Sequence, residues 1–349
     1  MREYIAFDSH KRYTLAERDP VGRGQPRQQR IEHRPGAIRE YLADCEPGTP
    51  VAVEATGNWY WIVDEIEQAG LKPLLVHPGK AKLMMGMINK TDKLDVHGLN
   101  RLQRNGTLPT VWIPPEALRD LRELTRTRMV LSRQRTRLKN RLGATLAKYG
   151  LVVEGFTDSF GVAARLLWPK LVAKLPCHTR FCCEVLLEEL DRVCEQIGRF
   201  EQRLSEVMKT TESMGLLLTM PGVGPILSSV IALEVGDVSR FPDAEHLASY
   251  AGTTPRVHSS GGKTRYGKLR SDVNRYLKWA FVEAGNSTVL CHRRHPQRHV
   301  SRLYVRLKSR KGHPKAVGAL ARHLAEATWH VLHRREPYRD PTLGQTRKA

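Results

Sequence analysis

The stretch Asn89-Lys-Thr-Asp-Lys-Leu-Asp-Val-His-Gly-Leu-Asn-Arg-Leu102 places two acids on the side of a helix that should be buried. Thr91 is a good N-cap, and no proline interrupts the residues after it. At about 100° per residue, the helix has two faces: one with Asp92, Asp95, Val96, Leu99 and Leu102, the other with Lys93, His97, Arg101 and Arg104. Two carboxylates that face a core repel each other and lose hydration, so we expect a positive partner beside them.

A divalent metal ion is the simplest such partner, because hard cations bind clustered carboxylate oxygens. In the alternative interpretation, Asp92 only caps the helix and Asp95 lies at the edge of the core. The helix by itself leaves both interpretations open.

Composition favours a polyanionic partner. The 349 residues carry a formal net charge of +21, and most of the basic residues are arginine, which binds phosphate bidentately. We therefore expect nucleic acid as the partner, with an anionic membrane surface as the rival. Asp8 argues against a targeting segment at the start, and the uncharged run 213–233 contains Pro221 and Pro225, which favours a helix break over a membrane span. Six cysteines without C-x-x-C spacing predict a reduced, cytoplasmic setting.

Strands and helices alternate in the N-terminal part, which predicts an α/β sheet with parallel members. The expected strands are 4–8, 13–16, 51–54 and 73–76, the expected helices are 35–45 and 59–69, and 22–29 is expected to be a polar loop. Ligand sites in such sheets lie at the carboxyl ends of strands, where both Asp8 and Glu54 fall. Each acid alone is explained as an ordinary loop residue or cap, but together with Asp92 and Asp95 they predict one site.

The middle of the chain is expected to be helical. Residues 116–149 have leucines close to a heptad seam, at Leu121, Leu124, Leu131, Leu138 and Leu142. The outer positions are crowded with basic residues, which are Arg126, Arg128, Arg133, Arg135, Arg137, Lys139 and Arg141. A more acidic helix is expected at 180–208, and the two helices would pair as an antiparallel hairpin or mediate dimerisation. Because the arginine excess survives any such pairing, we also expect nucleic-acid contacts from Arg128 and Arg135, against the alternative of a plain helical spacer.

Two segments of the C-terminal part suggest phosphate contacts. Pro221-Gly-Val-Gly224 resembles a helix-hairpin-helix turn, in which Gly222 and Gly224 let backbone amides approach a phosphate; the alternative is a tight helix connection without a ligand. Residues 258–262, His-Ser-Ser-Gly-Gly, are most simply a flexible loop. The basic residues that follow would attract a phosphate and stabilise an attacking alkoxide; they are Lys263, Arg265, Lys268 and Arg270. Helices are expected at 274–285 and 316–333, and His292, His295 and His299 are interpreted as phosphate-facing or solvated.

These motifs occur together in an order and spacing that belong to a known family. They are Asp8-Ser-His-Lys11, Glu54-Ala-Thr-Gly57, Lys90-Thr-Asp-x-x-Asp95, Pro221-Gly-Val-Gly224, Gly236-Asp237 with Arg240-Phe241, and Gly252-x-x-Pro255 ahead of Ser260-Gly-Gly262. Over nearly its whole length the chain resembles insertion-sequence transposases of the DEDD type, the group described as bridge-RNA-guided recombinases. Thr253 and Val273 depart from the residues usual in that family.

The resemblance implies three regions: a RuvC-like domain with a ribonuclease H-like fold at 1–115, a helical coiled coil at 116–212, and a mainly helical transposase domain at 213–349. It implies that Asp8, Glu54, Asp92 and Asp95 hold one or two Mg²⁺ ions, for which Mn²⁺ can substitute. It further implies that Ser260 is the nucleophile. Ser259 leaves that register ambiguous by one residue, and we prefer Ser260 because it adjoins Gly261.

The implied activity is breakage of one DNA strand by serine attack, which gives a covalent phosphoserine, followed by strand exchange. The implied partners are double-stranded DNA of the element ends and target, a noncoding guide RNA, and further copies of the chain in a dimer or tetramer associated with the nucleoid. Two alternatives stay open. One is a metal-dependent junction nuclease that uses water, and the other is a non-catalytic nucleic-acid-binding protein.

Overall fold

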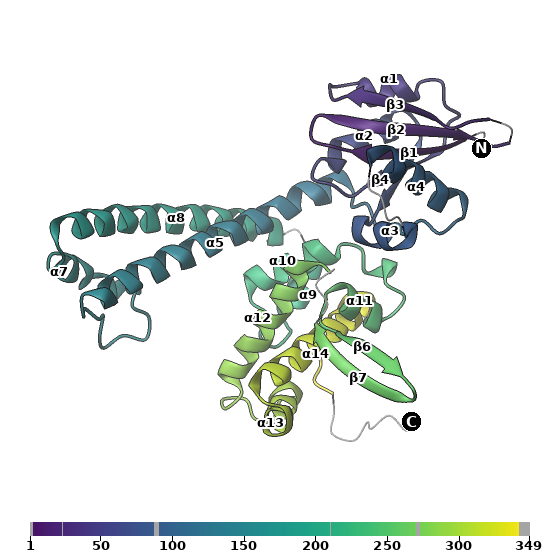
Figure 1. Ribbon diagram of the computed structural model, residues 1–349. Coiled ribbons are helices and arrows are strands. Elements are labelled where there is room, and N and C mark those ends of the chain that lie inside the picture. The colour runs from purple at the N-terminus through teal and green to yellow at the C-terminus, as the bar shows by residue number, and fades with distance from the viewer. Residues whose placement is uncertain (1–2, 23, 87–90, 210, 270–272, 342–349) are drawn as a thin grey trace. The chain divides into compact units, whose positions relative to one another are not determined.

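The computed structural model describes residues 3–22, 24–86, 91–209, 211–269 and 273–341 (Figure 1). Lys90 and Arg270, which the sequence analysis named, lie outside these residues. The chain divides into two compact units, Met1–Pro114 and Pro115–Ala349, which we call the first and second units. Each unit has hydrophobic clusters of its own.

The first unit is a mixed five-stranded sheet in the order β3-β2-β1-β4-β5. Its strands are β1 (Glu3–Ser9), β2 (Tyr13–Pro20), β3 (Arg27–Glu32), β4 (Pro50–Glu54) and β5 (Lys72–Val76). β1, β2 and β3 pair antiparallel, whereas β4 lies parallel to both β1 and β5. The expected α/β class is confirmed, with strands at or near the predicted positions.

Helices cover both faces of this sheet, because its strands are apolar on both sides. Ile5 and Phe7 pack in one cluster with α1 (Ala37–Leu42) and α2 (Trp59–Gln68). Ala6, between them in sequence, packs in the other cluster with α3 (Pro78–Met85) and α4 (Asp92–Arg104). The period of two along β1 thus assigns alternate residues to opposite helical layers.

The expected loop at 22–29 is wrong at its C-terminal end, where β3 begins at Arg27. Five of the six residues of β3 are exposed and only Ile31 is buried, so the strand lacks the apolar alternation that marks a half-buried strand. It is an edge strand, which backbone pairing to β2 stabilises rather than side-chain burial. Such a strand cannot be recognised from a hydrophobic pattern.

Two long helices of the second unit, α5 (Glu116–Lys148) and α8 (Cys177–Lys209), pair antiparallel (Figure 1). The contacts Arg128–Glu201 and Tyr149–Thr179 run in opposite directions along the two helices. Between them lie the short helices α6 (Val162–Arg165) and α7 (Trp168–Val172), which close a cluster around Leu142 and Trp168. The predicted antiparallel hairpin is confirmed.

Two arginines placed on the outer surface of α5 by the sequence analysis instead point to acids. Arg128 pairs with Glu201 of α8. Arg126 pairs with Glu234 of α10 (Pro225–Val235), with 2.7 Å between Arg126 Nε and Glu234 Oε1. Their assignment to outer positions of the helix is therefore wrong. The partner acids lie more than 70 residues away, so the helical pattern of α5 alone could not reveal them.

The rest of the second unit is mainly helical, as expected. Besides α10 it contains α9 (Glu212–Leu217), the 3₁₀ turn η1 (Val238–Arg240), α11 (Ala244–Tyr250), α12 (Arg275–Cys291), α13 (His299–Lys311) and α14 (His313–Arg334). Its core forms where α10, α12 and α14 meet around Ile231, Phe281 and Leu324. Across the described residues, no helix has the length and apolar character that crossing a membrane requires.

The expected flexible loop at 258–262 is wrong, because the segment forms a β-hairpin. β6 (Pro255–Ser260) pairs antiparallel with β7 (Lys263–Leu269), and Gly261 and Gly262 make the two-residue turn. Both glycines have positive φ, +56° and +73°, which this tight connection favours. Every residue from Arg256 to Lys268 is exposed, so the hairpin projects from the helical body.

Candidate functional site

The sheet of the first unit brings Asp8 and Glu54 to the same edge and face. Phe7 of β1 pairs with Val53 of β4, so Asp8 and Glu54 each follow that pair by one residue on parallel strands. Alternation along both strands gives Asp8 the same side as Ala6, and Glu54 the same side as Ala52. Both alanines pack in the cluster that contains α4. The two acids therefore lie at carboxyl strand ends, on the side where α4 covers the sheet.

Helix α4 begins at this same edge. The Thr91 hydroxyl accepts a hydrogen bond from the backbone N–H of Leu94 at 3.3 Å, which confirms the predicted N-cap. Asp92 and Asp95 are half-buried in the first turn of the helix, while Val96 and Leu99 are fully buried. The prediction that the acids share the apolar side of the helix is confirmed.

Asp8 and Asp92 converge on His10, a residue of the Asp8-Ser-His-Lys11 motif for which no role was predicted. Nε2 of His10 lies 3.3 Å from Asp8 Oδ2 and 3.2 Å from Asp92 Oδ2. The Tyr13 hydroxyl donates a hydrogen bond to Asp92 Oδ2 at 3.0 Å, and its ring stacks on His10. Asn58 Nδ2 donates to the backbone carbonyl of His10 at 2.7 Å, which ties the β1–β2 turn to the segment after Glu54.

The electrostatics of Asp8 reflect burial among acids. Burial raises the pKa of the Asp8 carboxyl, His10 lowers this pKa, and the nearby Asp92 and Asp95 raise it again, with a net upward shift. An ionised Asp8 is therefore unfavourable unless positive charge compensates it. Asp95 contributes to the same field, and half-buried Glu54 occupies the adjacent strand end.

The residues at this edge suit a divalent cation. One ligand atom from each of Asp8, His10 and Asp92 lies within 4.8 Å of the others, which no other described cluster of acids, histidines or cysteines matches. His10 Nε2 is buried between the two carboxylates, at 3.3 and 3.2 Å from their oxygens. A ring nitrogen in this position fits a metal ligand or the positive charge that these acids need. In the sequence, His10 could have been recognised from its position two residues after Asp8, an acid at the end of a strand.

The hairpin of the second unit separates the two candidate serines onto opposite faces. Ser260 pairs with Lys263, and His258 pairs with Arg265 on the same side, because successive pairs alternate. Ser259 pairs with Thr264 on the opposite side, together with the pair Val257 and Tyr266. Ser260 thus shares its face with cationic residues, whereas Ser259 shares its face with a hydroxyl and an exposed apolar pair.

The glycines of the turn between α9 and α10 differ in what they permit. A Cβ on Gly222, whose φ is +77°, would lie 2.2 Å from the carbonyl oxygen of Ala284 and 2.6 Å from Thr288 Oγ1. A Cβ on Gly224, the N-cap of α10, would meet nothing within 4 Å. Gly222 is therefore required for packing against α12. Gly224 leaves open space at a helix N-terminus.

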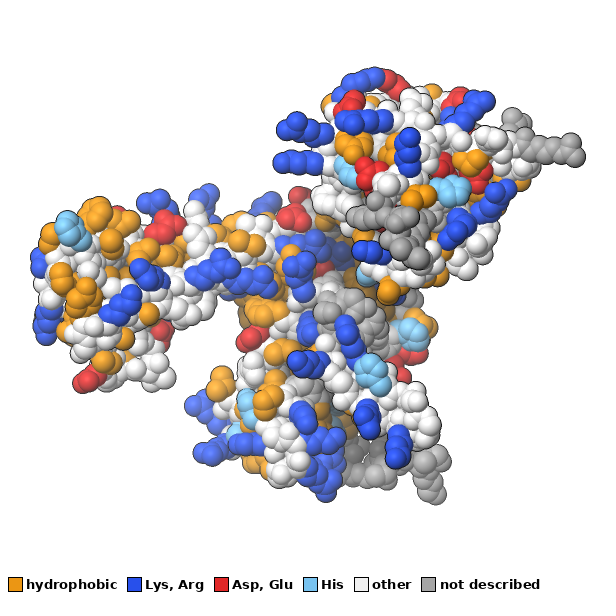
Figure 2. All heavy atoms as spheres, viewed as in Figure 1, with side chains coloured by type: hydrophobic (Ala, Val, Ile, Leu, Met, Phe, Trp, Pro, Cys, Tyr) orange, Lys and Arg blue, Asp and Glu red, His pale blue; other side chains and the backbone are white. Residues whose placement is uncertain are grey.

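The basic residues expected to contact nucleic acid fall into two groups. Lys263, Arg265 and Lys268 are exposed along β7. Arg128 is paired with Glu201 between the two helices. Arg135 is half-buried near Asp158, whose pKa is lowered mainly by the backbone N–H of Phe160 and less by Lys139 and Arg135. Figure 2 also shows Lys and Arg side chains gathered in the region that Figure 1 labels α13. A cavity of about 630 Å³ there is lined by His292, Arg293, Pro296, Ser301, Arg302, Val305 and Arg306.

Comparisons of the sequence with protein families give two matches. Residues 214–300 match the profile described as the transposase IS116/IS110/IS902 family. Residues 21–150 match a second transposase profile, that of the DEDD domain of IS110 transposases. The first region contains the hairpin with Ser260, and the second contains Glu54, Asp92 and Asp95.

Several relatives match over most of both chains. A protein of Pseudomonas aeruginosa named "Probable family 20 transposase" is 26% identical over 86% of this chain and 89% of its own length. The transposase of insertion sequence element IS1111A from Coxiella burnetii is 27% identical over 83% of this chain and 79% of its own. The transposase of element IS1328 from Yersinia enterocolitica is 25% identical over 84% of this chain and 86% of its own length.

Proposed function

This chain belongs to the IS116/IS110/IS902 family of insertion-sequence transposases, and we propose that it cuts and rejoins DNA through a covalent serine–phosphate intermediate. The observation that carries the proposal is the convergence of Asp8 and Asp92 on His10 at the carboxyl edge of β1. The strand order β3-β2-β1-β4-β5, with antiparallel and parallel halves, supports a ribonuclease H-like, RuvC-like fold for this unit.

We assign Asp8, Asp92, Asp95 and Glu54 to binding one or two divalent ions, Mg²⁺ or Mn²⁺, with His10 between the first two. A bound ion would neutralise charge on a scissile phosphate and on the attacking oxygen. The buried Asp8 and the Tyr13 hydrogen bond hold two of the carboxylates in fixed positions. Preorganised ligands of this kind need little reorganisation when the substrate binds.

We assign the nucleophile to Ser260. Its Oγ attacks the phosphorus, an Oγ–P bond forms, and the P–O bond to one sugar breaks. The serine proton is lost and the departing sugar hydroxyl gains one, so the step needs no other reactant. The reverse step, with a hydroxyl from another strand, restores the serine and completes strand exchange. Lys263, Arg265 and His258, on the Ser260 face, provide positive charge for the phosphate.

The partners follow from this assignment. The net charge of +21 suits double-stranded DNA and a noncoding guide RNA, which would choose the element ends and target by base pairing. The exposed β7 cations and the N-terminus of α10 at Gly224 in a helix-hairpin-helix turn would contact backbone phosphates. Strand exchange requires at least two copies of the chain, in a dimer or tetramer, acting at the nucleoid.

The test is a denaturing gel of labelled element-end DNA incubated with protein, Mg²⁺ and RNA transcribed from the flanking noncoding region. Wild type should give a slow, protease-sensitive band, and Ser260→Ala and Asp92→Ala should not, although both still bind DNA. Ser259→Ala is the matched control and should keep the band. Cleaved DNA without a covalent band in any variant would instead establish the junction-nuclease alternative. Loss of the band in Ser259→Ala alone would move the nucleophile by one residue.

A further inference from the structure

The β6–β7 hairpin, which carries Ser260 and is called the serine hairpin from here on, is attached to the helical body through two adjoining chain segments. On the N-terminal side, Tyr250 ends α11; on the C-terminal side, Asn274 precedes α12. The backbone N–H of Asn274 donates to the carbonyl of Tyr250 at 3.2 Å. A Cβ on Gly252 would lie 2.3 Å from Val273 Cγ2. The two segments are therefore also in close contact at these residues, which lie nearer to the hairpin. Since Arg256 to Lys268 are all exposed, the segments at the two ends of the hairpin contribute strongly to its direction. On the N-terminal side, the hydroxyl and the backbone N–H of Thr253 also donate to the Ala248 carbonyl, at 2.9 and 3.1 Å.

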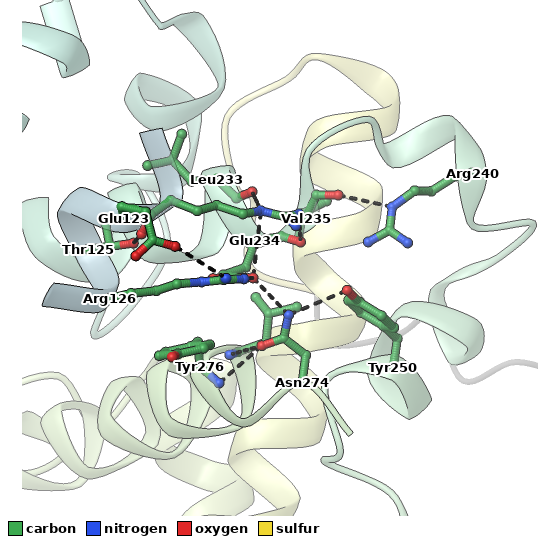
Figure 3. Close-up of polar contacts among 12 residues, drawn as sticks. Glu123, Thr125, Arg126, Leu233, Glu234, Val235, Arg240, Tyr250, Asn274 and Tyr276 are labelled. Carbon is green, nitrogen blue, oxygen red and sulfur yellow. Dashed lines mark hydrogen bonds and ion pairs between the residues drawn. The ribbon is translucent and has the colours of Figure 1, made fainter. Parts of the chain in front are cut away.

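The attachment is fastened to a buried carboxylate. Glu234 of α10 is fully buried, and Asn274 Nδ2 donates to its Oε2 at 2.9 Å (Figure 3). Arg126 of α5 binds the same carboxylate through two nitrogens, at 2.7 and 3.0 Å. Figure 3 shows that these side chains come from three separate segments, which are α5, α10 and the residue before α12. One carboxylate therefore connects the long helix α5 to Asn274, the residue that precedes α12.

Asn274 has a second role that can be separated from this connection. Its Oδ1 accepts hydrogen bonds from the backbone N–H groups of Tyr276 and Leu277, at 3.0 and 3.1 Å, and so caps α12. Its amide group donates to Glu234 and, at 3.4 Å, to the Tyr250 hydroxyl. An oxygen is sufficient for the cap, whereas the contact with Glu234 needs a donor.

We propose that Glu234 and Asn274 are positioning residues for Ser260. Together they hold the serine hairpin in a fixed orientation relative to α5. The proposal rests on the proposed function, because it assigns them an effect on the serine reaction. A buried ion pair contributes little net stability compared with apolar packing, but a wrong arrangement of it is strongly disfavoured. Such a network is therefore suited to fixing one geometry. A misplacement of about 1 Å in a reacting group can slow a reaction about a hundredfold.

The chain offers a charge-exchange test. Asn274→Asp keeps the oxygen that caps α12 but sets a second carboxylate against Glu234. Glu234→Gln keeps the shape at that position and supplies an amide. In the double variant, the introduced glutamine donates to the introduced aspartate, so the hydrogen bond returns with its direction reversed. Arg126 keeps its bond to the remaining side-chain oxygen at position 234 and loses the one to Oε2. Val331→Ala, which truncates a buried side chain of α14, is the control for a general loss of stability.

The first readout is the rate of covalent adduct formation at saturating DNA, measured with the melting temperature and the DNA Kd. We expect Asn274→Asp to slow the adduct step at least tenfold with an unchanged Kd, and the double variant to recover most of the rate. An unchanged rate in Asn274→Asp, a loss that only parallels melting temperature as in Val331→Ala, or no recovery in the double variant would overturn the proposal.

The second readout does not depend on the reaction. Spin labels on Cys291 and on Thr264→Cys, with the other exposed cysteines replaced by serine, report the hairpin orientation relative to α12. Asn274→Asp should broaden the distance distribution, and the double variant should narrow it again. If wild type forms no adduct, the serine mechanism fails, while this measurement still decides whether the Glu234–Asn274 contact orients the hairpin. An equally narrow distribution in every variant would refute that orientation.

Discussion

Replacing Asp8 by Asn should affect the stability of the first unit in opposite directions with and without Mg²⁺. Without metal, the net upward shift of the Asp8 pKa means that its ionised form disfavours folding at neutral pH. Asn has nearly the same shape and no charge, so Asp8→Asn should raise the melting temperature in EDTA. The nearby carboxylate of Asp92 acts in the same direction, although its side chain is 46% exposed and water weakens the repulsion.

With metal, the order should reverse. A ligand at one hundred times its Kd stabilises the folded state by about 2.7 kcal/mol if the unfolded chain does not bind it. For a unit of this size, roughly 4 °C accompanies each kcal/mol, so wild type should gain roughly 10 °C. Asp8→Asn removes the buried carboxylate that is proposed as a ligand, so this variant should gain little. Calorimetry of the full chain in EDTA and in Mg²⁺ measures both effects on the transition of the first unit.

Asp19→Asn is the matched control, because Asp19 is also buried on the β1–β2 pair but is bound by Arg104 at 3.2 Å. It pairs with Tyr4 at the opposite end of β1, away from the proposed site. Its removal should lower the melting temperature in EDTA and leave the gain from Mg²⁺ intact. The reasoning is refuted if Asp8→Asn behaves as Asp19→Asn does.

Three further predictions concern the second unit. Gly222→Ala should cost roughly 2–4 kcal/mol of unfolding free energy by chemical denaturation, because its Cβ would collide with Ala284, whereas Gly224→Ala should cost under about 1 kcal/mol; equal costs would contradict the packing argument. Replacing Lys263 and Arg265 by Gln should weaken DNA binding and reduce the slope of log K against log salt by about one for each phosphate that the variant no longer binds, so an unchanged slope would place them away from DNA. Burial lowers the pKa of His323 to about 4, so between about pH 6.5 and 4 the unfolded chain binds a proton that the folded chain does not. The free energy of unfolding should therefore fall by about 3 kcal/mol over this range, and His323→Leu should remove most of the decrease in urea titrations at several pH values.

The parts of the fold that could be predicted are those with an apolar period. Helix α4 was found from Val96, Leu99 and Leu102 and from its cap at Thr91, and all of these behave as expected. Strand β3 and the serine hairpin were missed because their residues are exposed and backbone pairing or glycine turns define them. In α5, Arg119 and Arg122 are buried, whereas two of the expected seam leucines, Leu121 and Leu124, are half-buried. Helical periodicity cannot show that another element supplies acids to a basic face.

The candidate site was predictable to the same degree and for a related reason. Topology alone could bring Asp8 and Glu54 together, because parallel strands end at one edge. The position of His10 depends instead on a three-residue turn and on a side chain, Asn58, from another segment. Contacts between side chains and distant backbone leave no periodic trace in the sequence. Residue order therefore predicted that Asp8 and Glu54 share an edge of the sheet, but not that His10 lies between Asp8 and Asp92.

Buried charge is used differently in the two units, and the difference separates binding from positioning. In the first unit, Asp8 lies among acids, and the flanking His10 does not prevent a net upward shift of its pKa, so the charge there is incompletely compensated and suits a cation. In the second unit, two arginines approach the Glu234 carboxylate, Arg126 with two hydrogen bonds and Arg122 at 3.7 Å, so its charge is already compensated by the protein. An incompletely compensated site gains free energy from a ligand, whereas a compensated one gains none and instead restricts geometry. On this basis we assign Asp8 to the proposed metal-dependent chemistry and Glu234 to the proposed placement of Ser260.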